Sequence, residues 1–214
     1  MHGLDRPRQF LAAALAALAG YVDAEGFLSA DRYFVSFMSG NTTRLATDLA
    51  IAGRSASAPA LLIAGFVLGV AGGHVVAHLA GAMRKPAVLM LVTLLLAIGA
   101  SCAIAGQIPG MMACLVLAMG ALNNTLQRDE SPVALTYLTG ALVRIGQSLG
   151  SLVTGRRQEP VWPFLAMWLA LAAGAGIGAL AFLSLGPASL WFAVVATLLL
   201  TIAGYRLARR ASRS

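Results

Sequence analysis

The segment Phe37-Met38-Ser39-Gly40-Asn41-Thr42-Thr43-Arg44 decides how this chain folds, because it sets hydroxyl, amide and guanidinium groups between two long apolar runs. A helix needs about 20 consecutive apolar residues to cross about 30 Å of hydrocarbon. Residues 33–53 are helical in pattern but too polar to face lipid, since polar breaks at membrane depth need protein or water around them. The segment therefore predicts a re-entrant or broken helix.

The composition around this segment is that of a membrane protein. Of the 214 residues, 59% are hydrophobic and only 11% are charged, and the mean hydropathy is +0.81. A soluble protein of this size would need more charged side chains to cover its surface. The net charge of +7 comes largely from Arg and Lys beside apolar runs, where cytoplasmic retention of basic residues explains it. We therefore expect no nucleic-acid partner and no ordinary cytosolic enzyme.

Six stretches are apolar enough to be transmembrane helices, and prolines separate most of them. They are residues 10–28, 60–83, 87–106, 111–126, 164–183 and 190–207. A second polar segment, residues 133–155, is helical in pattern and resembles the first in carrying Thr139-Gly140 and Arg144.

The chain also resembles itself after a shift of one hundred residues. The shift places Phe37-Met38-Ser39-Gly40 on Tyr137-Leu138-Thr139-Gly140 and Asp23 on Asn123. With two more residues inserted, Gly72 meets Gly174 and Phe66 meets Trp168. Both halves then have one order of segments, which predicts a duplicated unit: residues 1–108 and 109–214, within one integral membrane domain.

Charge indicates how the two halves lie in the bilayer. If both polar segments return to the side from which they enter, each half has three spans and the halves are inverted. Arg84, Lys85 and Arg128 then lie inside with both termini, as the positive-inside rule favours. We therefore expect an all-α integral membrane protein with six transmembrane helices and two re-entrant or broken polar helices, arranged as two inverted repeats.

Two strings carry a resemblance to a known family. Gly20-Tyr21-Val22-Asp23-Ala24 is followed by residues 34–42, and in the second half residues 121–128 are followed by residues 134–140. Both resemble signatures of the YoaK-like family of bacterial membrane proteins, domain of unknown function 1275. The resemblance covers nearly the whole chain and implies a multi-pass protein, often taken for a transporter, without an established substrate. Glu25 departs from the family pattern, which has a small or apolar residue there.

The two polar segments predict a solute site. We expect Asn41 to be the N-cap of a half-helix whose N-terminus, with its free amides and positive dipole end, lies inside the membrane. The second half would face it with Thr139 and Gly140. The alternative is that these small polar residues only allow close helix packing. The candidate substrate-binding residues are Ser39, Gly40, Asn41, Thr42, Asn123, Thr139, Gly140 and Arg144.

Three charged residues are candidates for ion coupling. Acids within a membrane are costly and by default mark a functional pathway, which favours Asp23 as a proton- or cation-coupling group. The alternative is a buried salt bridge from Asp23 to Arg44. Glu25 is nearer the helix end, and we expect it to be solvated. Arg44 would pair with Asp48, with Asp23 or with an anion, whereas Arg144 has no acid four residues on and is the better anion ligand.

Taken together, the sequence predicts a small-solute transporter or channel-like permease of a bacterial inner membrane, with both termini cytoplasmic. Its solute would be small and polar or anionic, and neither a metal nor another cofactor is expected. Glycine-rich faces could also support a homodimer. The alternatives are a non-catalytic membrane assembly or regulatory protein and, with less support, a membrane-embedded enzyme.

Overall fold

The computed structural model describes residues 6–52, 55–125, 127–128, 131–132, 139–154 and 161–211. Within these residues the chain is almost entirely helical, as predicted. Two 3-10 turns, η1 (Gly81–Met83) and η2 (Gly186–Ser189), each join two helices, and two-residue strands β1 (Gln127–Arg128) and β2 (Ser131–Pro132) pair antiparallel. The helices are α1 (Arg6–Ser29), α2 (Met38–Ala50), α3 (Ser57–Ala80), α4 (Arg84–Ile104), α5 (Ile108–Leu122), α6 (Thr139–Thr154), α7 (Trp162–Leu185) and α8 (Leu190–Ala211).

Each of the six predicted apolar stretches is found as one helix. By length and hydropathy, the described residues hold three stretches able to cross a membrane: Gln9–Ser29, Ser57–Ile104 and Trp162–Arg206. The second contains both α3 and α4, and the third contains α7 and most of α8. The 15 residues of α5 extend only about 22 Å at about 1.5 Å per residue, so α5 is shorter than the hydrocarbon layer.

α5 ends at Leu122, four residues before the predicted limit at residue 126. Two asparagine side chains donate hydrogen bonds to backbone carbonyl oxygens at this end of the helix. The Asn123 amide donates to the Met119 carbonyl at 2.9 Å, and the Asn124 amide donates to the Val70 carbonyl of α3 at 2.9 Å. Side-chain amides that bind backbone carbonyls compete with continued helix, so these residues end α5 and attach it to α3.

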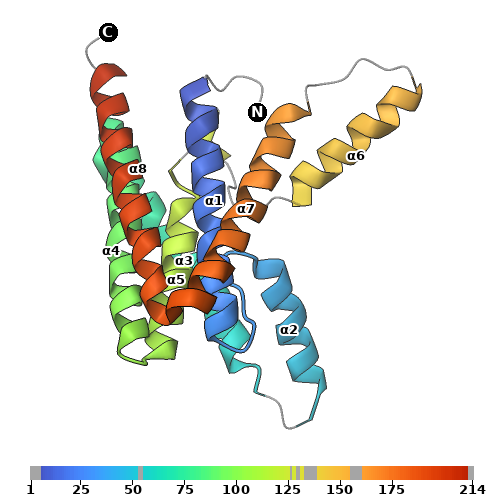
Figure 1. Ribbon diagram of the computed structural model, residues 1–214, viewed down its shortest axis with the longest axis vertical. Coiled ribbons are helices and arrows are strands. Elements are labelled where there is room, and N and C mark those ends of the chain that lie inside the picture. The colour runs from blue at the N-terminus through green and yellow to red at the C-terminus, as the bar shows by residue number, and fades with distance from the viewer. Residues whose placement is uncertain are drawn as a thin grey trace.

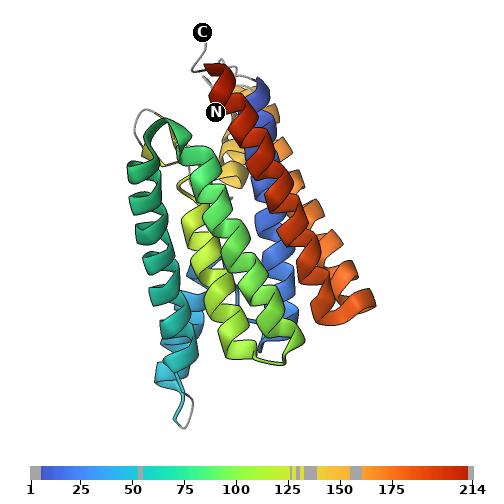
Figure 2. The same ribbon diagram turned by 90° about the vertical axis from the view of Figure 1, so that its left-hand side faces the viewer.

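The long helices stand side by side, whereas α2 and α6 project from the same side of the bundle (Figure 1). α2 begins near mid-height and runs to the lower end of the view, and α6 begins near mid-height and runs to the upper end. The start of α1, the end of α8 and the turn between α3 and α4 lie at the upper end (Figures 1 and 2). Neither α2 nor α6 therefore runs the full height of the bundle.

α1 packs against α7 through glycines that bring the two backbones together. A Cβ on Gly174 would lie 1.9 Å from the Ala17 carbonyl oxygen, and one on Gly178 would lie 2.6 Å from the Tyr21 carbonyl oxygen. Contacts four residues apart on both helices mean that α1 and α7 run in the same direction. Small residues permit such close approach where lipid provides no hydrophobic drive for helices to associate.

α3 packs against α5 in the same manner. A Cβ on Gly69 would lie 2.3 Å from the Leu117 carbonyl oxygen, and one on Gly73 would lie 2.7 Å from the Ala121 Cα. These two helices are also parallel. The sequence shows the glycines but does not show which helix each of them faces.

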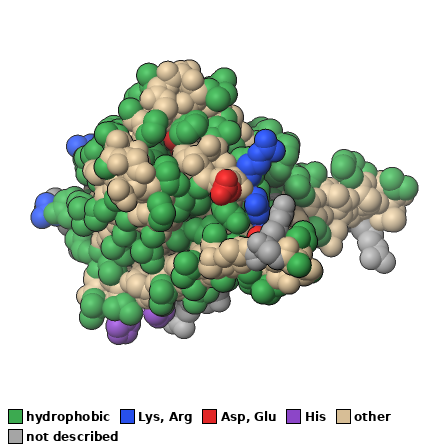
Figure 3. Space-filling model, turned by 90° about the horizontal axis from the view of Figure 1, so that it is seen from below, with side chains coloured by type: hydrophobic (Ala, Val, Ile, Leu, Met, Phe, Trp, Pro, Cys, Tyr) green, Lys and Arg blue, Asp and Glu red, His purple; other side chains and the backbone are tan. Residues whose placement is uncertain are grey.

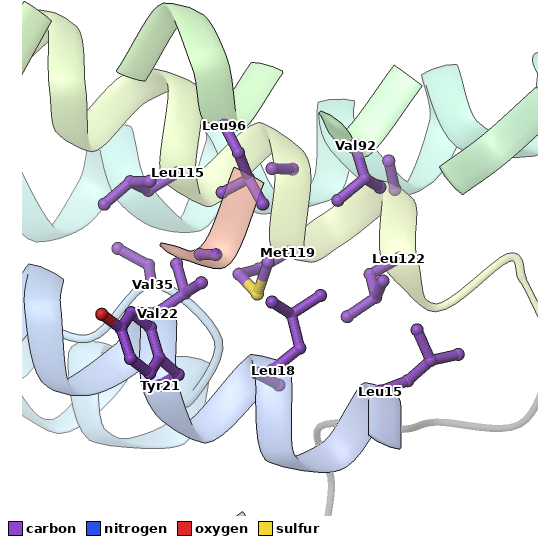
Figure 4. Packing of buried hydrophobic residues seen from close by; sticks show 14 of the residues in the cluster. Leu15, Leu18, Tyr21, Val22, Val35, Val92, Leu96, Leu115, Met119 and Leu122 are labelled. Carbon is purple, nitrogen blue, oxygen red and sulfur yellow. The ribbon is translucent and has the colours of Figure 1, made fainter. Parts of the chain in front are cut away.

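The buried core lies between α1, α4 and α5. Leu18 and Val22 of α1 point toward Leu96 of α4 and toward Leu115 and Met119 of α5 (Figure 4). The outward faces of the bundle are apolar too, with large exposed side chains along α3, α7 and α8. The lower end is mostly hydrophobic or uncharged, with few charged side chains (Figure 3). An apolar exterior of this extent is typical of helices that face lipid.

Candidate functional site

A cavity of about 580 Å³ lies between α1, the 30–37 loop, α6 and α7. Phe37, which directly precedes α2, and Thr139, the first residue of α6, both line it. The N-terminal ends of the two short helices therefore border one cavity. Helix N-termini carry unpaired backbone amides and a positive dipole end, which favour a polar or negatively charged partner.

Asp23 lines the cavity and holds the 30–37 loop. One carboxylate oxygen accepts hydrogen bonds from the backbone N–H groups of Val35 and Ser36, both at 2.8 Å, and the other accepts one from the Ser36 hydroxyl. No salt bridge joins Asp23 to Arg44 in the described residues. Two backbone amides and a hydroxyl compensate the charge instead, so Asp23 positions the loop that leads into α2.

Asn41 does not cap α2, which corrects the prediction. The helix begins at Met38 with Phe37 as its N-cap and no side-chain capping bond, and Asn41 lies in the first turn. Its amide donates to the Phe34 carbonyl at 2.7 Å and its oxygen accepts from the Phe34 N–H at 3.1 Å. The buried Asn41 thus binds both backbone groups of one loop residue, a role that needs the fold of the loop and leaves no local sequence signal.

Arg44 binds the same loop rather than an acid. Its guanidinium donates to the carbonyl oxygens of Asp31 and Arg32, at 2.7 and 3.2 Å, and lies 4.2 Å from the ring centroid of Tyr33. Both carbonyls belong to residues with positive φ, 40° and 58°, a conformation that costs non-glycine residues about 1–2 kcal/mol. Arg44 stabilises this turn, and the expected pairs with Asp23 and Asp48 are not the ones it forms.

The cavity wall is mainly aromatic and aliphatic. Phe27, Phe34 and Phe37 form a continuous cluster, with ring centroids 5.0 and 5.3 Å apart, and Trp168 of α7 and Leu142 of α6 complete the wall. Sequence analysis missed these rings. Their spacing on α1 and the following loop carries no signal until the loop folds back on the helix.

The remaining predicted residues fall in different places. Among those candidates, only Thr139 lines the cavity. Ser39, Thr42 and Arg144 are exposed, Gly140 is half-buried, and Asn123 is buried at the end of α5. A Cβ on Gly40 would lie 2.8 Å from the Phe37 ring and 3.0 Å from the Phe34 ring, so Gly40 makes room for the aromatic cluster. Tyr137, Leu138 and the side chain of Arg128 lie outside the described residues.

Glu25 is buried, which corrects the expectation that it is solvated. Its exposed fraction is 0%, and neither carboxylate oxygen has a hydrogen-bond partner among the described residues. The hydroxyls of Tyr21 and Ser189 lie beside its carboxylate. Position along α1 suggested solvent, but η2 from the other half of the chain covers this end of the helix. The four-residue spacing of Tyr21 and Glu25 was the available sequence signal.

Comparison with known proteins supports a membrane protein. A family model described as "Protein of unknown function (DUF1275)" matches residues 11–203. The chain is 40% identical over 211 residues to a UPF0700 transmembrane protein of Rhizobium meliloti (strain 1021), an alignment that covers 94% of this chain and 87% of the relative. No solved structure matches the chain. The motifs therefore led to the right family, and the chain is a membrane protein that belongs to the DUF1275 family.

Proposed function

We propose that this protein is a small-solute permease whose solute occupies the cavity between α1, the 30–37 loop, α6 and α7. The observation that carries the proposal is that two half-length helices, α2 and α6, begin at this one cavity. Discontinuous helices whose N-termini meet inside the membrane are the usual way in which inverted-repeat transporters build a substrate site.

Helix packing supports two repeats, residues 1–108 and 109–214. Gly20 approaches the Leu171 carbonyl of α7, and Gly120 approaches the Phe66 carbonyl of α3; a Cβ on these glycines would lie 2.1 and 2.3 Å from the respective oxygens. Gly20 and Gly120 are 100 residues apart, and Phe66 and Leu171 are 105 apart. The first helix of each half thus packs on the third helix of the other half through equivalent residues.

The glycine contacts of α3 and α7 also change the residue shift that aligns the two halves. Gly69 and Gly174 make equivalent contacts, and so do Gly73 and Gly178, with 105 residues between the members of each pair. Gly81 and Gly186, also 105 apart, end α3 and α7 with positive φ values of 53° and 60°. The third helices therefore match with a shift of 105, three more than the 102 that pairs Gly72 with Gly174.

The direction of the helices supports an inverted relation between the halves. α1 starts at the end of the bundle where α8 ends, whereas α5 starts at the opposite end (Figures 1 and 2). Arg84 and Lys85 begin α4 at the same end as the start of α1, which the positive-inside rule would make cytoplasmic. In this topology α1, α3, α4, α7 and α8 cross a bacterial inner membrane, and α5 crosses it as a span shorter than the hydrocarbon layer. α2 enters from outside and α6 from inside.

The lining favours a small solute with an apolar part and a polar group. Phe27, Phe34 and Trp168 offer ring faces, while Asp23, Thr139 and the helix N-termini offer polar contacts. Arg144 is exposed and absent from the lining, so nothing in the described lining provides a cation for an anion. We therefore favour an uncharged polar solute over the anion considered from the sequence.

Proteoliposome swelling tests the proposal. Liposomes with the purified protein are shrunk in solutions of uncharged and charged solutes below about 200 Da, and solute entry is followed by light scattering. Leu142→Trp narrows the cavity, and Val143→Trp adds the same ring to the neighbouring exposed position of α6. We expect Leu142→Trp to reduce entry and Val143→Trp to leave it unchanged. Equal entry in protein-free liposomes, or equal effects of the two variants, would refute a permeation path here.

A further inference from the structure

Glu25 presents a carboxyl group whose charge nothing in its surroundings balances. It lies in α1, one helical turn before Ser29, and its exposed fraction is 0%. Both oxygens are buried without a hydrogen-bond partner among the described residues. An unpaired ionised carboxylate is among the most costly groups to bury. A helix that places Glu there therefore needs something to neutralise it.

The neighbouring hydroxyls have backbone carbonyl acceptors of their own within hydrogen-bond distance. The Tyr21 hydroxyl donates its proton to the Ser189 carbonyl oxygen at 2.8 Å, and the Ser189 hydroxyl donates to the Gly186 carbonyl oxygen at 2.5 Å. Each hydroxyl has one proton, and a carbonyl can only accept. With the hydroxyl protons directed to these carbonyls, Glu25, Tyr21 and Ser189 supply four side-chain oxygens and no free donor.

In the described part of the chain, no charged side chain beside Glu25 neutralises its carboxylate. From α1 the group acting on the carboxyl is Tyr21, and from η2 it is Ser189; no Lys, Arg or His of the described residues is among the groups that act on it. Asp23, two residues away on α1, is bound to Val35 and Ser36 of the loop. Four oxygen atoms that carry one negative charge and have no hydrogen-bond donor among them are suitable ligands for a cation.

We propose that Glu25, Tyr21 and Ser189 form a binding site for one small monovalent cation, Na⁺ or a proton. One carboxylate balances one charge. Ca²⁺ takes six to eight oxygens, commonly from several carboxylates. The described residues hold no cluster of three His, Cys, Asp or Glu side chains that could bind a metal ion of higher charge.

The position of the site links it to the proposed solute cavity. Glu25 follows Asp23 and Ala24, which line the cavity, and Ser189 lies in the turn between α7, another wall of the cavity, and α8. A cation bound between α1 and η2 holds α1 against the turn that follows α7, and both α1 and α7 border the cavity. This coupling rests on the proposed function, whereas cation binding itself does not.

Thermal unfolding of the purified protein in detergent tests the site without any transport assay. NaCl is exchanged for choline chloride at constant ionic strength, and separately the pH is varied. A ligand that binds only the folded state raises the melting temperature by mass action. If Na⁺ is the occupant, the melting temperature rises with Na⁺ at fixed pH; if a proton is, it rises only as the pH falls.

Glu25→Gln should abolish the response that the wild type shows. The glutamine amide donates to the same oxygens, as a protonated acid would, so the variant should fold and be stable without the cation. Asp31→Asn is the matched control, because it removes an exposed acid near the same end of α1, and it should keep the response. An unchanged response in Glu25→Gln, or no response in the wild type, would overturn the proposal.

Two further variants keep the test decisive if Glu25→Gln does not fold. Tyr21→Phe and Ser189→Ala each remove one oxygen, and each should shift the midpoint of the Na⁺ or pH response several-fold in cation concentration. An unchanged midpoint in both would exclude these ligands. If a variant loses cation binding but still admits solute, the cation site is independent of the permease. If cation binding is observed but no solute enters the liposomes, the permease proposal alone is refuted.

Discussion

Replacing Gly174 by alanine should separate α1 from α7. The added Cβ would lie 1.9 Å from the Ala17 carbonyl oxygen, 2.7 Å from its carbonyl carbon and 2.8 Å from its Cα. All three are backbone atoms of a neighbouring helix, so no side chain can rotate away. Ordinary contacts between carbon atoms lie at about 3.5–4.0 Å, so the helices would have to move apart by more than an ångström.

The expected cost follows from two opposing terms. Overpacking a tight contact costs about 1–3 kcal/mol or more, and the Gly→Ala exchange returns up to about 1 kcal/mol in helix propensity. Gly174→Ala should therefore lower the free energy of unfolding by about 1–2 kcal/mol. A Cβ on Gly176, in the same helix, would have nothing within 4 Å, so Gly176→Ala should gain the propensity term alone.

Equilibrium unfolding in mixed micelles measures both variants under one condition. α3 provides an independent pair: a Cβ on Gly69 would meet the Leu117 carbonyl at 2.3 Å, and one on Gly72 would meet nothing. We expect Gly69→Ala to destabilise and Gly72→Ala to stabilise. If the two alanines of either pair had the same effect, the parallel glycine contacts would not hold the bundle together.

The 30–37 loop gives two further predictions. Asp23→Ala should destabilise the protein by about 2–3 kcal/mol, because three donors lose a charged acceptor. Asp23→Asn should retain most of the stability, because its side-chain oxygen still accepts from the backbone. Hydrogen exchange of the Ser36 amide distinguishes the two variants. Asn41→Ala should lower the free energy of unfolding by about 1–2 kcal/mol, because it leaves both backbone groups of Phe34 unpaired. Thr42→Ala, at an exposed position, is the control in the same unfolding experiment. Equal effects of the two variants would exclude a stabilising contact between Asn41 and Phe34.

Sequence patterns located the helices well because the bilayer imposes length and hydropathy on each of them. These patterns could not show which residues contact each polar side chain. The rarity of acids in apolar helices predicted a coupling role for Asp23, but the pattern did not indicate its three donors, which come from a loop more than ten residues away. Glu25 looked solvated because only its distance from the helix end was visible, and Ser189, more than 160 residues later, covers it.

The two halves share their packing but differ in their polar groups, and that difference bears on direction. With the shift of 100 residues, Asp23 matches Asn123 and Glu25 matches Thr125. The Thr125 hydroxyl is also buried without a partner among the described residues, so both positions place an unpaired oxygen near the end of the first helix of each half. Only Glu25 carries a charge. Two inverted repeats with equal chemistry would make the two sides of the membrane equivalent, and a cation site in one half alone removes that equivalence. A cation bound there would couple to solute movement by binding one conformation of the protein more tightly than the other.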